Sequence, residues 1–233
     1  MKSSSMRQRG MTLIEIMISM AVMTMMLVSI WSGFNGTVKG MEVAEEIQFR
    51  YSNVRAGMTR IVTEMSMAYL SFNRPNDDEK HYTLFEGRDS FDTDSVTFSS
   101  FGHLRIRKDT NESDQSIIQY FVQEDRNDPS RNHLYRRESR RLTGDRPEDL
   151  EDFFPAYVLI EDVVLFDVKY WDPQEMEWRD EWATMRIDMQ PDRLPQRIKI
   201  RIVIKDGRGE VEFVNQVVPL MQEKIDLEKG STK

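Results

Sequence analysis

Hydrophobic positions form one long, uninterrupted run near the start of the chain. From Met11 to Trp31 there are 21 residues, mostly apolar, and Glu15 is the only one that carries a charge. A helix rises about 1.5 Å per residue, so a helix of this length spans roughly 30 Å, the thickness of the hydrocarbon core of a bilayer. The run therefore predicts a membrane-spanning helix over residues 11–32.

A second, amphipathic helical pattern follows the apolar run. Between Ile47 and Phe72 apolar residues recur at spacings of three and four, whereas charged residues such as Glu64 lie off this stripe. The pattern is typical of one buried helix face, so we predict that the helix continues over residues 33–72 and packs on a sheet. The three glycines in residues 33–40 predict a weak or bent stretch, or close packing against a neighbour, because each lowers helix stability by roughly 1 kcal/mol relative to alanine.

The rest of the chain shows the alternation and the turn signals of a β-rich domain over residues 73–221. The segments predicted as strands are 81–86, 95–101, 104–108, 116–123, 133–138, 163–171, 183–189, 196–205 and 210–218. Residues 206–209 predict a hairpin turn, residues 139–152 a charged loop, and residues 222–233 a charged tail. One long helix followed by antiparallel strands is an α+β design.

The chain is acidic and contains no cysteine. Its 233 residues carry a formal net charge of −8, which argues against nucleic acid as a partner because phosphates repel an acidic surface. Without cysteine there is no disulfide, no thiolate nucleophile and no cysteine-ligated metal. The basic pairs Arg136-Arg137 and Arg140-Arg141 are interrupted by Glu138 and lie beside acidic residues, so we interpret them as a solvated mixed-charge loop and not as a phosphate site.

The charges on the two sides of the apolar run differ in sign. Lys2, Arg7 and Arg9 precede it without any acidic residue, and glutamates such as Glu42 follow it. By the positive-inside rule, the N-terminus stays in the cytoplasm and the C-terminal bulk of the chain crosses the membrane.

Two simpler interpretations of the apolar run are a secretory signal peptide and a plain signal anchor. A signal peptide has a shorter apolar core and a cleavage site of small residues, whereas residues 30–34 are a poor site of that kind. A plain anchor explains the run but not Glu15, because a carboxylate inside a membrane helix costs about 2.5–3.5 kcal/mol. A residue that is so unfavourable in lipid is a candidate functional residue.

The segment Arg9-Gly10-Met11-Thr12-Leu13-Ile14-Glu15, followed by the apolar run, resembles the N-terminus of type IV pilins and pseudopilins. The resemblance implies that residues 1–10 are a leader, that a prepilin peptidase cuts between Gly10 and Met11, and that the new amine of Met11 is methylated. It also implies a pilin-like fold and a filament in which Glu15 of one subunit faces the Met11 amine of a neighbour. Met11 departs from the phenylalanine that is most common in the family at this position.

Within this family the chain resembles the J-type minor pseudopilins of type II secretion. The resemblance rests on the aromatic segment 166–172, on Trp178, and on Leu194-Pro195 leading into the alternating strand 197–204. It implies a single-pass inner-membrane protein whose periplasmic domain joins I-type and K-type partners at the tip of a pseudopilus. That tip complex starts pseudopilus assembly and supports the export of folded proteins across the outer membrane.

Two other non-enzymatic functions share the N-terminal features. A minor type IV pilin, acting in filament assembly, adhesion or twitching, would carry the same N-terminus. Trp171, Trp178 and Trp182 could line a ligand site in such an adhesin, although clustered tryptophans are more often found in cores and interfaces. The other alternative is a signal-anchored periplasmic domain, which would keep residues 1–10 attached.

No motif of an enzyme or of a metal site is found in the sequence. His81, His103 and His133 are isolated from one another, and the acidic segments 77–79 and 125–128 lack the spacing of an EF-hand. We therefore predict no catalytic residue, no metal and no cofactor. The expected partners are other minor pseudopilins, the prepilin peptidase and inner-membrane lipid.

Overall fold

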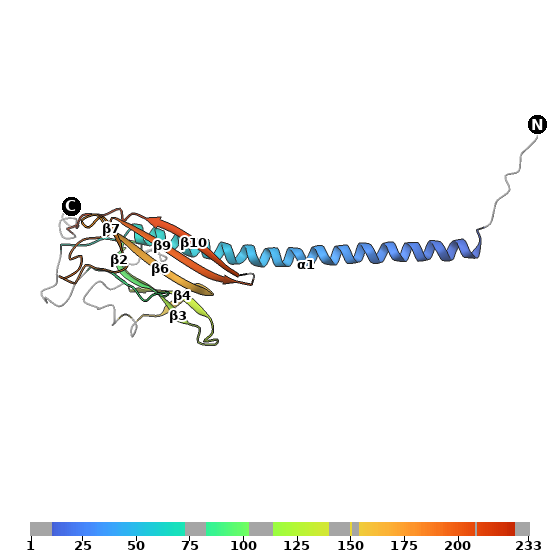
Figure 1. The fold of residues 1–233 in the computed structure, drawn as a ribbon, viewed down its shortest axis with the longest axis horizontal. Coiled ribbons are helices and arrows are strands. Elements are labelled where there is room, and N and C mark those ends of the chain that lie inside the picture. The colour runs from blue at the N-terminus through green and yellow to red at the C-terminus, as the bar shows by residue number, and fades with distance from the viewer. Residues whose placement is uncertain are drawn as a thin grey trace, which may run out of the picture. The chain divides into compact units, whose positions relative to one another are not determined.

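The computed structural model describes residues 11–72, 83–102, 114–139, 150, 154–207 and 209–226. The chain divides into two compact units, Met1–Ser52 and Asn53–Lys233. Helix α1 (Leu13–Ser66) runs from the first unit into the second, and every strand in the described residues lies in the second unit (Figure 1). The predicted α+β class, with a long N-terminal helix and antiparallel sheets, is confirmed.

In the first unit, α1 exposes its side chains along its whole apolar length. Residues 11–46 are all exposed. The hydroxyls of Ser19, Thr24 and Ser29 donate to the backbone carbonyl four residues earlier, at 2.7, 2.8 and 2.9 Å, so they leave no open donor on this surface. The helix is continuous through the glycines in residues 33–40, because glycine lowers helix stability without removing a backbone hydrogen bond. Packing of this stretch against a neighbour stays a prediction.

In the second unit, the last turns of α1 bury one face. The apolar stripe predicted from the sequence is confirmed there by the buried residues Val54, Met58, Ile61 and Met65. Gly57 lies on the same face, and a Cβ at this position would be 2.7 Å from a side-chain carbon of Ile160. The helix therefore approaches the sheet closely at Gly57.

The periodicity of the sequence predicts a helix that continues to Phe72, but α1 ends at Ser66. The prediction is wrong for the last six residues. Ala68 forms an antiparallel bridge with Ser100, and the N–H of Tyr69 donates to the carbonyl of the preceding residue of that strand at 3.1 Å. Ala68 and Tyr69 are fully buried in this extended conformation. Pairing with the sheet thus takes over the backbone hydrogen bonds that a longer helix would have made within itself.

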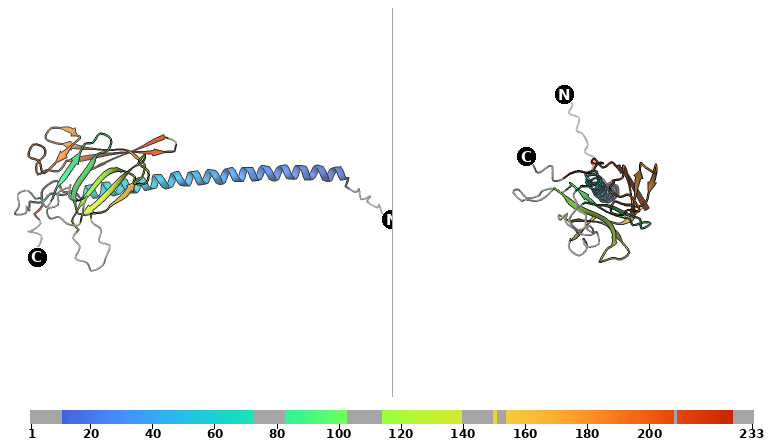
Figure 2. Two further views of the ribbon diagram at one scale, coloured as in Figure 1. Left: turned by 90° about the horizontal axis from the view of Figure 1, so that it is seen from below. Right: turned by 90° about the vertical axis from the view of Figure 1, so that its left-hand side faces the viewer.

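The strands in the described residues form two sheets, and every pair within them is antiparallel. One sheet has the order β5-β4-β3-β2-β1-β8 and the other β10-β9-β6-β7. Their bounds are β1 (Phe85–Arg88), β2 (Ser95–Ser100), β3 (Ser116–Glu124), β4 (Asn132–Ser139), β5 (Ala156–Ile160), β6 (Val163–Asp172), β7 (Glu177–Arg179), β8 (Trp182–Ala183), β9 (Arg197–Asp206) and β10 (Gly209–Val217). Figure 2 shows the orange and red strands of the second sheet as a layer apart from the green strands of the first.

Six predicted strands agree with β2, β3, β4, β6, β9 and β10 to within one residue at each end. The hairpin turn between β9 and β10 is confirmed, and Gly209 takes a φ of 149° there, which favours glycine. Strands β5 and β7 were not predicted, because β5 is a short edge strand with exposed apolar side chains and β7 has only 3 residues. The predicted strand 104–108 and most of the predicted loop 139–152 lie outside the described residues.

The predicted strand 183–189 is wrong beyond Ala183. The Thr184 N–H donates to the Phe85 carbonyl at 3.1 Å, and the Gln190 side chain accepts the Ala183 N–H at 3.2 Å. The first bond continues the contact with β1, whereas Gln190 and Asp192 also donate their N–H groups to the carbonyls of Ala183 and Thr184 and so fold the segment back on itself. Only the two residues of β8 therefore pair with β1 as a strand. β1 itself begins at Phe85, later than predicted, and the first two residues of that prediction are not described.

Aromatic side chains form a continuous line between the two sheets. Ring centres are 6.2 Å apart for Phe98 and Tyr120, 5.8 Å for Phe85 and Phe98, and 5.8 Å for Phe85 and Tyr170. Gly87 makes room for this packing, because a Cβ at Gly87 would lie 2.0 Å from the Tyr170 hydroxyl oxygen. The core therefore joins β1, β2 and β3 of one sheet to β6 of the other.

Asp94 ties the two sheets together just before β2 begins. Its side chain is 3% exposed, and it accepts backbone N–H groups from Ser90 at 3.1 Å and from Val168 in β6 at 2.8 Å. Burial raises the pKa of Asp94 to about 6, with help from the neighbouring charges of Asp89 and Asp167 and against the lowering effect of the two N–H donors. Asp94 therefore links the two sheets at a cost, because burial disfavours the charged form of its side chain.

We expect the stability of the protein to record the titration of Asp94. Its pKa in the folded chain, about 6, lies above its ordinary value of 3.8, so protonation stabilises the fold and this contribution is lost as the pH rises through about 6. Asp94→Asn cannot titrate. Between about pH 4 and about pH 7 the unchanged protein should lose about 2 kcal/mol relative to the variant, because a tenfold change in an ionisation constant corresponds to about 1.4 kcal/mol and part of the loss falls below pH 4.

Urea unfolding of the full chain in detergent measures this difference. Asp92→Asn, which removes an exposed carboxylate in the same turn, is the control and should keep the pH dependence of the unchanged protein. A difference between Asp94→Asn and the unchanged protein that stays constant over this pH range would contradict the prediction.

Candidate functional site

Thr12 and Glu15 close the first turn of α1. The Thr12 carbonyl accepts the N–H of Glu15 at 3.1 Å and that of Ile16 at 3.3 Å, and the Glu15 carboxylate accepts the Thr12 backbone N–H at 3.4 Å. A threonine followed three residues later by glutamate is the signature of a helix capping box, in which the carboxylate satisfies an N–H left open by the helix. Glu15 thus caps its own helix in addition to the predicted role in filament assembly. The Thr-x-x-Glu spacing of the sequence could have predicted this capping bond.

Glu15 lies among exposed apolar side chains. Met11, Leu13 and Ile14 are each more than half exposed, and Glu15 is exposed as well. In the part of the chain that the structure describes, α1 is the one helix long and apolar enough to cross a membrane. Gly10 lies outside the described residues, so the geometry of the predicted cleavage bond is not seen.

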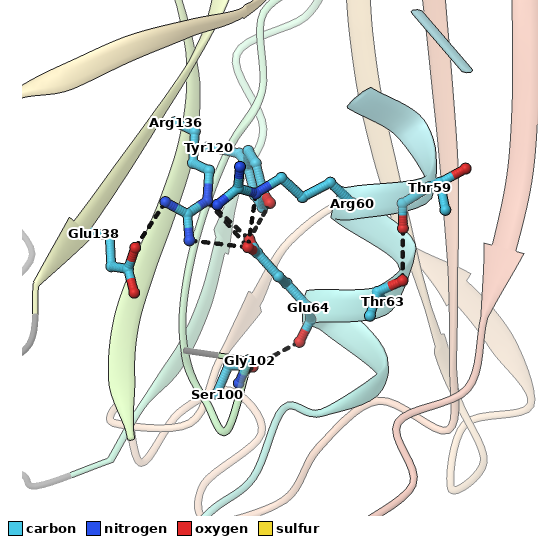
Figure 3. A network of polar contacts seen from close by, with 9 residues as sticks. All are labelled: Thr59, Arg60, Thr63, Glu64, Ser100, Gly102, Tyr120, Arg136 and Glu138. Carbon is cyan, nitrogen blue, oxygen red and sulfur yellow. Dashed lines mark hydrogen bonds and ion pairs between the residues drawn. The ribbon is translucent and has the colours of Figure 1, made fainter. Parts of the chain in front are cut away.

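Glu64 is the centre of a buried polar network in the second unit (Figure 3). Arg136 in β4 donates its Nε to Glu64 Oε2 at 3.0 Å and its Nη2 to Oε1 at 2.9 Å. Tyr120 in β3 donates its hydroxyl to Oε2. Arg60, one helical turn earlier, donates to Oε1 at 3.0 Å, and Glu138 accepts the Nη1–H of Arg136 at 2.9 Å.

The charges of this network balance inside the fold. The side chains of Glu64 and Arg136 are only 6% and 7% exposed. Burial lowers the pKa of the Arg136 guanidinium, but the hydrogen bonds and the charge of Glu64 outweigh burial and raise it above its ordinary value. Burial, together with the charge of Glu64, raises the pKa of Tyr120 well above its ordinary value. Tyr120 is therefore a permanent donor, and Arg136 a permanent cation.

The backbone of Glu64 is also held by the sheet. The hydroxyl of Ser100, at the end of β2, donates to the Glu64 carbonyl at 2.8 Å, and the Gly102 N–H donates to the same hydroxyl at 3.0 Å. A Cβ on Gly102 would lie 3.1 Å from the Glu64 Cγ. One residue near the end of α1 therefore connects the helix to β2, β3 and β4.

Two sequence-based interpretations of these charges are wrong. The helical pattern places Glu64 off the buried stripe, yet it is buried, and the basic pair Arg136-Arg137 lies in a strand with both side chains buried. Arg137 donates to the Gln119 side chain at 2.7 Å. Charges that are paired inside the fold can be buried at a tolerable cost, and the partner of Glu64 lies far away in the sequence. Arg140-Arg141 lie outside the described residues.

The three clustered tryptophans separate into two environments. Trp182 is fully buried and donates its indole N–H to the Arg193 carbonyl at 2.9 Å. Trp171 and Trp178 face each other across β6 and β7 and are partly exposed. Trp182 is therefore a core residue, and only the other two could contact a partner.

The remaining polar candidates form no metal site in the described residues, where no group of three histidines and carboxylates converges. His133 is buried and accepts the Asp162 backbone N–H at 3.1 Å. In the acidic segment 125–128, the side chain of Asp128 accepts the N–H of Ser130 at 3.1 Å. His81, His103 and residues 77–79 are not described.

Two protein families match this chain. The family described as "Type II secretion system (T2SS), protein J" matches residues 32–214, and the family described as "Prokaryotic N-terminal methylation motif" matches residues 5–31. The chain belongs to the type II secretion system protein J family. The J-type resemblance predicted from the late aromatic segment is thereby confirmed. A single-pass inner-membrane protein fits this family and the one helix in the described residues that is apolar enough to span a membrane.

Solved structures include a similar chain in "The Crystal Structure of the GspK-GspI-GspJ complex from enterotoxigenic Escherichia coli Type 2 Secretion System". The similarity has a TM-score of 0.46 at 11% identity and covers 73% of this chain and 97% of that chain. No curated protein sequence matches this member of the protein J family.

We expect Glu64→Gln to destabilise the second unit strongly. The amide keeps the size of the side chain but removes the charge that balances Arg136, and breaking one side of a buried ion pair costs about 3–5 kcal/mol. Urea unfolding of the full chain in detergent measures the change in the free energy of unfolding. Glu46→Gln, an exposed position on the same helix, should change it by less than about 0.5 kcal/mol. Equal unfolding midpoints for the two variants would show that the network does not stabilise the fold.

Proposed function

We propose that this protein is a minor pseudopilin that joins I-type and K-type partners in the complex at the tip of the pseudopilus. This complex starts pseudopilus assembly and supports the export of folded proteins across the outer membrane. The proposal is carried by one observation, the presence in a single chain of the methylation motif at residues 5–31 and the protein J match at residues 32–214. The protein acts by assembling with other subunits and does no chemistry on a substrate.

The charge distribution supports a defined orientation in the inner membrane. Residues 11–32 span the bilayer with the basic segment 1–10 in the cytoplasm, and the second unit lies in the periplasm. The satisfied hydroxyls of Ser19, Thr24 and Ser29 suit this segment to lipid, because an unbonded donor is costly in hydrocarbon. The same apolar surface can later exchange lipid for the helices of neighbouring subunits.

Processing by the prepilin peptidase places a positive charge next to the carboxylate of Glu15. The peptidase cuts between Gly10 and Met11 and methylates the amine of Met11, which becomes the first residue. The new cationic amine and Glu15 then lie within the first turns of an apolar helix. Each of the two groups is unfavourable in lipid unless an opposite charge is near.

Among the described residues, Glu15 has one weak partner. Its bond to the Thr12 N–H is 3.4 Å long, and that donor is a neutral dipole. A cationic amine of a neighbouring subunit supplies a full charge, and in a low-dielectric surrounding the attraction between opposite charges is large enough to offset desolvation. Exchange of the capping bond for this ion pair favours entry into the filament with a fixed axial stagger between subunits.

Mass spectrometry of the protein purified from membranes tests the processing step. We expect the mature chain to begin at Met11 with a methylated amine, because the peptidase reads the glycine at the cut. Gly10→Leu should instead retain residues 1–10. A mature chain that begins at Met1, or one that begins beyond the apolar run, would contradict the proposal.

Glu15→Gln tests the ion pair separately from the capping bond, because the amide still accepts the Thr12 N–H but carries no charge. We expect alkali-resistant membrane insertion to be unchanged. Co-purification with the I-type and K-type subunits should fall by about tenfold or more, which corresponds to about 1.4 kcal/mol.

Glu42→Gln is the matched control, because it removes the same charge from an exposed position of α1 beyond the apolar run. It should co-purify as the unchanged protein does. Normal co-purification of Glu15→Gln would overturn the role of the ion pair while leaving the family membership intact.

A further inference from the structure

One surface of the four-stranded sheet combines tryptophans with cations. Arg197 in β9 lies opposite Trp171 in β6, and Trp171 lies opposite Trp178 in β7. In the next row, Lys199 of β9 lies opposite Lys169 of β6. Residues opposite each other in neighbouring strands share one face of a sheet, and so do residues two apart in one strand. These five residues therefore form one surface, the aromatic–cationic face.

The aromatic half of this face is a preformed ledge. The centres of the Trp171 and Trp178 rings are 5.5 Å apart, with the rings inclined at 65°. The guanidinium carbon of Arg197 lies 5.1 Å from the centre of the Trp171 ring, within the range of a cation–π interaction. Both indoles are partly exposed and Arg197 is exposed, so the ledge offers apolar area beside a positive charge.

The cationic half of the face is incompletely neutralised. Lys169 binds Asp180 at 2.6 Å, but Lys199 has no carboxylate partner among the described residues, and neither has Arg197. Like charges directly opposite each other in a sheet are destabilising, so Lys199 is unfavourably placed opposite Lys169, although Asp180 offsets part of the repulsion. Gln216, on the other side of Lys199, adds no negative charge.

The neutralised and unneutralised cations lie at different places along β9. Arg201 lies opposite Asp167 and binds Glu212, so two carboxylates more than neutralise the cation at that position. Arg197 and Lys199 have no carboxylate partner among the described residues, although the chain as a whole has a net charge of −8. This part of the sheet is therefore a local reversal of the charge of the molecule, and an anionic partner would relieve the repulsion there.

We propose that the aromatic–cationic face binds an acidic, extended segment of a partner protein. Carboxylates of that segment pair with Lys199 and Arg197, and its apolar side chains cover Trp171 and Trp178. Carboxylates on alternate residues of an extended segment point to the same side, as do the two cations of β9. This surface is independent of the contact between Glu15 and a neighbouring amine.

Binding of two matched peptides to the full-length protein in a nonionic detergent tests the proposal. The probes are a fluorescently labelled peptide that alternates glutamate and valine, and a control peptide with lysine in place of glutamate. We expect the acidic peptide to bind at low ionic strength, the basic peptide not to bind, and added salt to weaken the complex. Lys199→Gln should weaken binding by about two- to fivefold, the range expected for one partly exposed ion pair.

Tryptophan indole resonances locate the bound peptide. With four tryptophans in the chain, the signals of Trp171 and Trp178 should shift on binding, and those of Trp31 and Trp182 should not. Arg126→Gln removes a cation from an exposed turn elsewhere in the domain and is the matched control, which should bind the peptide as the unchanged protein does.

Three outcomes would overturn the proposal. The first is equal binding of the acidic and basic peptides. The second is equal weakening by Lys199→Gln and Arg126→Gln, which would indicate attraction to the whole molecule and not to this face. The third is a shift of the Trp171 and Trp178 signals with a neutral oligosaccharide but not with the acidic peptide, which would make the ledge a carbohydrate site.

Discussion

The pairing of Glu64 with Arg136 is the interaction that couples helix α1 to the six-stranded sheet. A carboxylate on the helix receives two bonds from a guanidinium in β4 and one from a tyrosine in β3, while its own carbonyl is held from the end of β2. Each of these charges would be costly to bury alone, so the helix can take only the rotation and the axial position in which all of them meet. The apolar stripe buries Val54, Met58, Ile61 and Met65 against the domain, whereas the ion pair and its hydrogen bonds require one setting of the helix.

The same helix carries a second carboxylate in the opposite situation. Glu64 pairs with a cation within the chain, whereas among the described residues Glu15 contacts a backbone N–H at 3.4 Å and is surrounded by exposed apolar side chains. In the proposed function the missing cation comes from another subunit. In that proposal, α1 uses a paired, buried carboxylate to attach its own domain and a second carboxylate to select a neighbour, since a charge in an apolar surrounding favours any state that supplies an opposite charge.

The two sheets are joined by a different combination of forces. A line of aromatic rings from Tyr120 to Tyr170 fills the space between them, and Asp94 adds hydrogen bonds from β6 to the segment before β2. The far surface of the four-stranded sheet keeps two partly exposed indoles and two cations without carboxylate partners among the described residues. One face of this sheet is buried in the core, and the opposite face carries charges and indoles that suit a partner.

The sequence alone determined the features that depend on residues close to one another in the chain. The apolar run, the position of Glu15, the six strands with clear alternation and the β9–β10 turn are of this kind, because helix and strand periods and turn chemistry act over a few residues. Tertiary structure alone decided the end of α1 at Ser66, the short strands β5 and β7, and the burial of Glu64 and Arg136. Each of these depends on a contact between distant segments, such as Ala68 with Ser100, and local propensity carries no information about which distant residue will supply the partner.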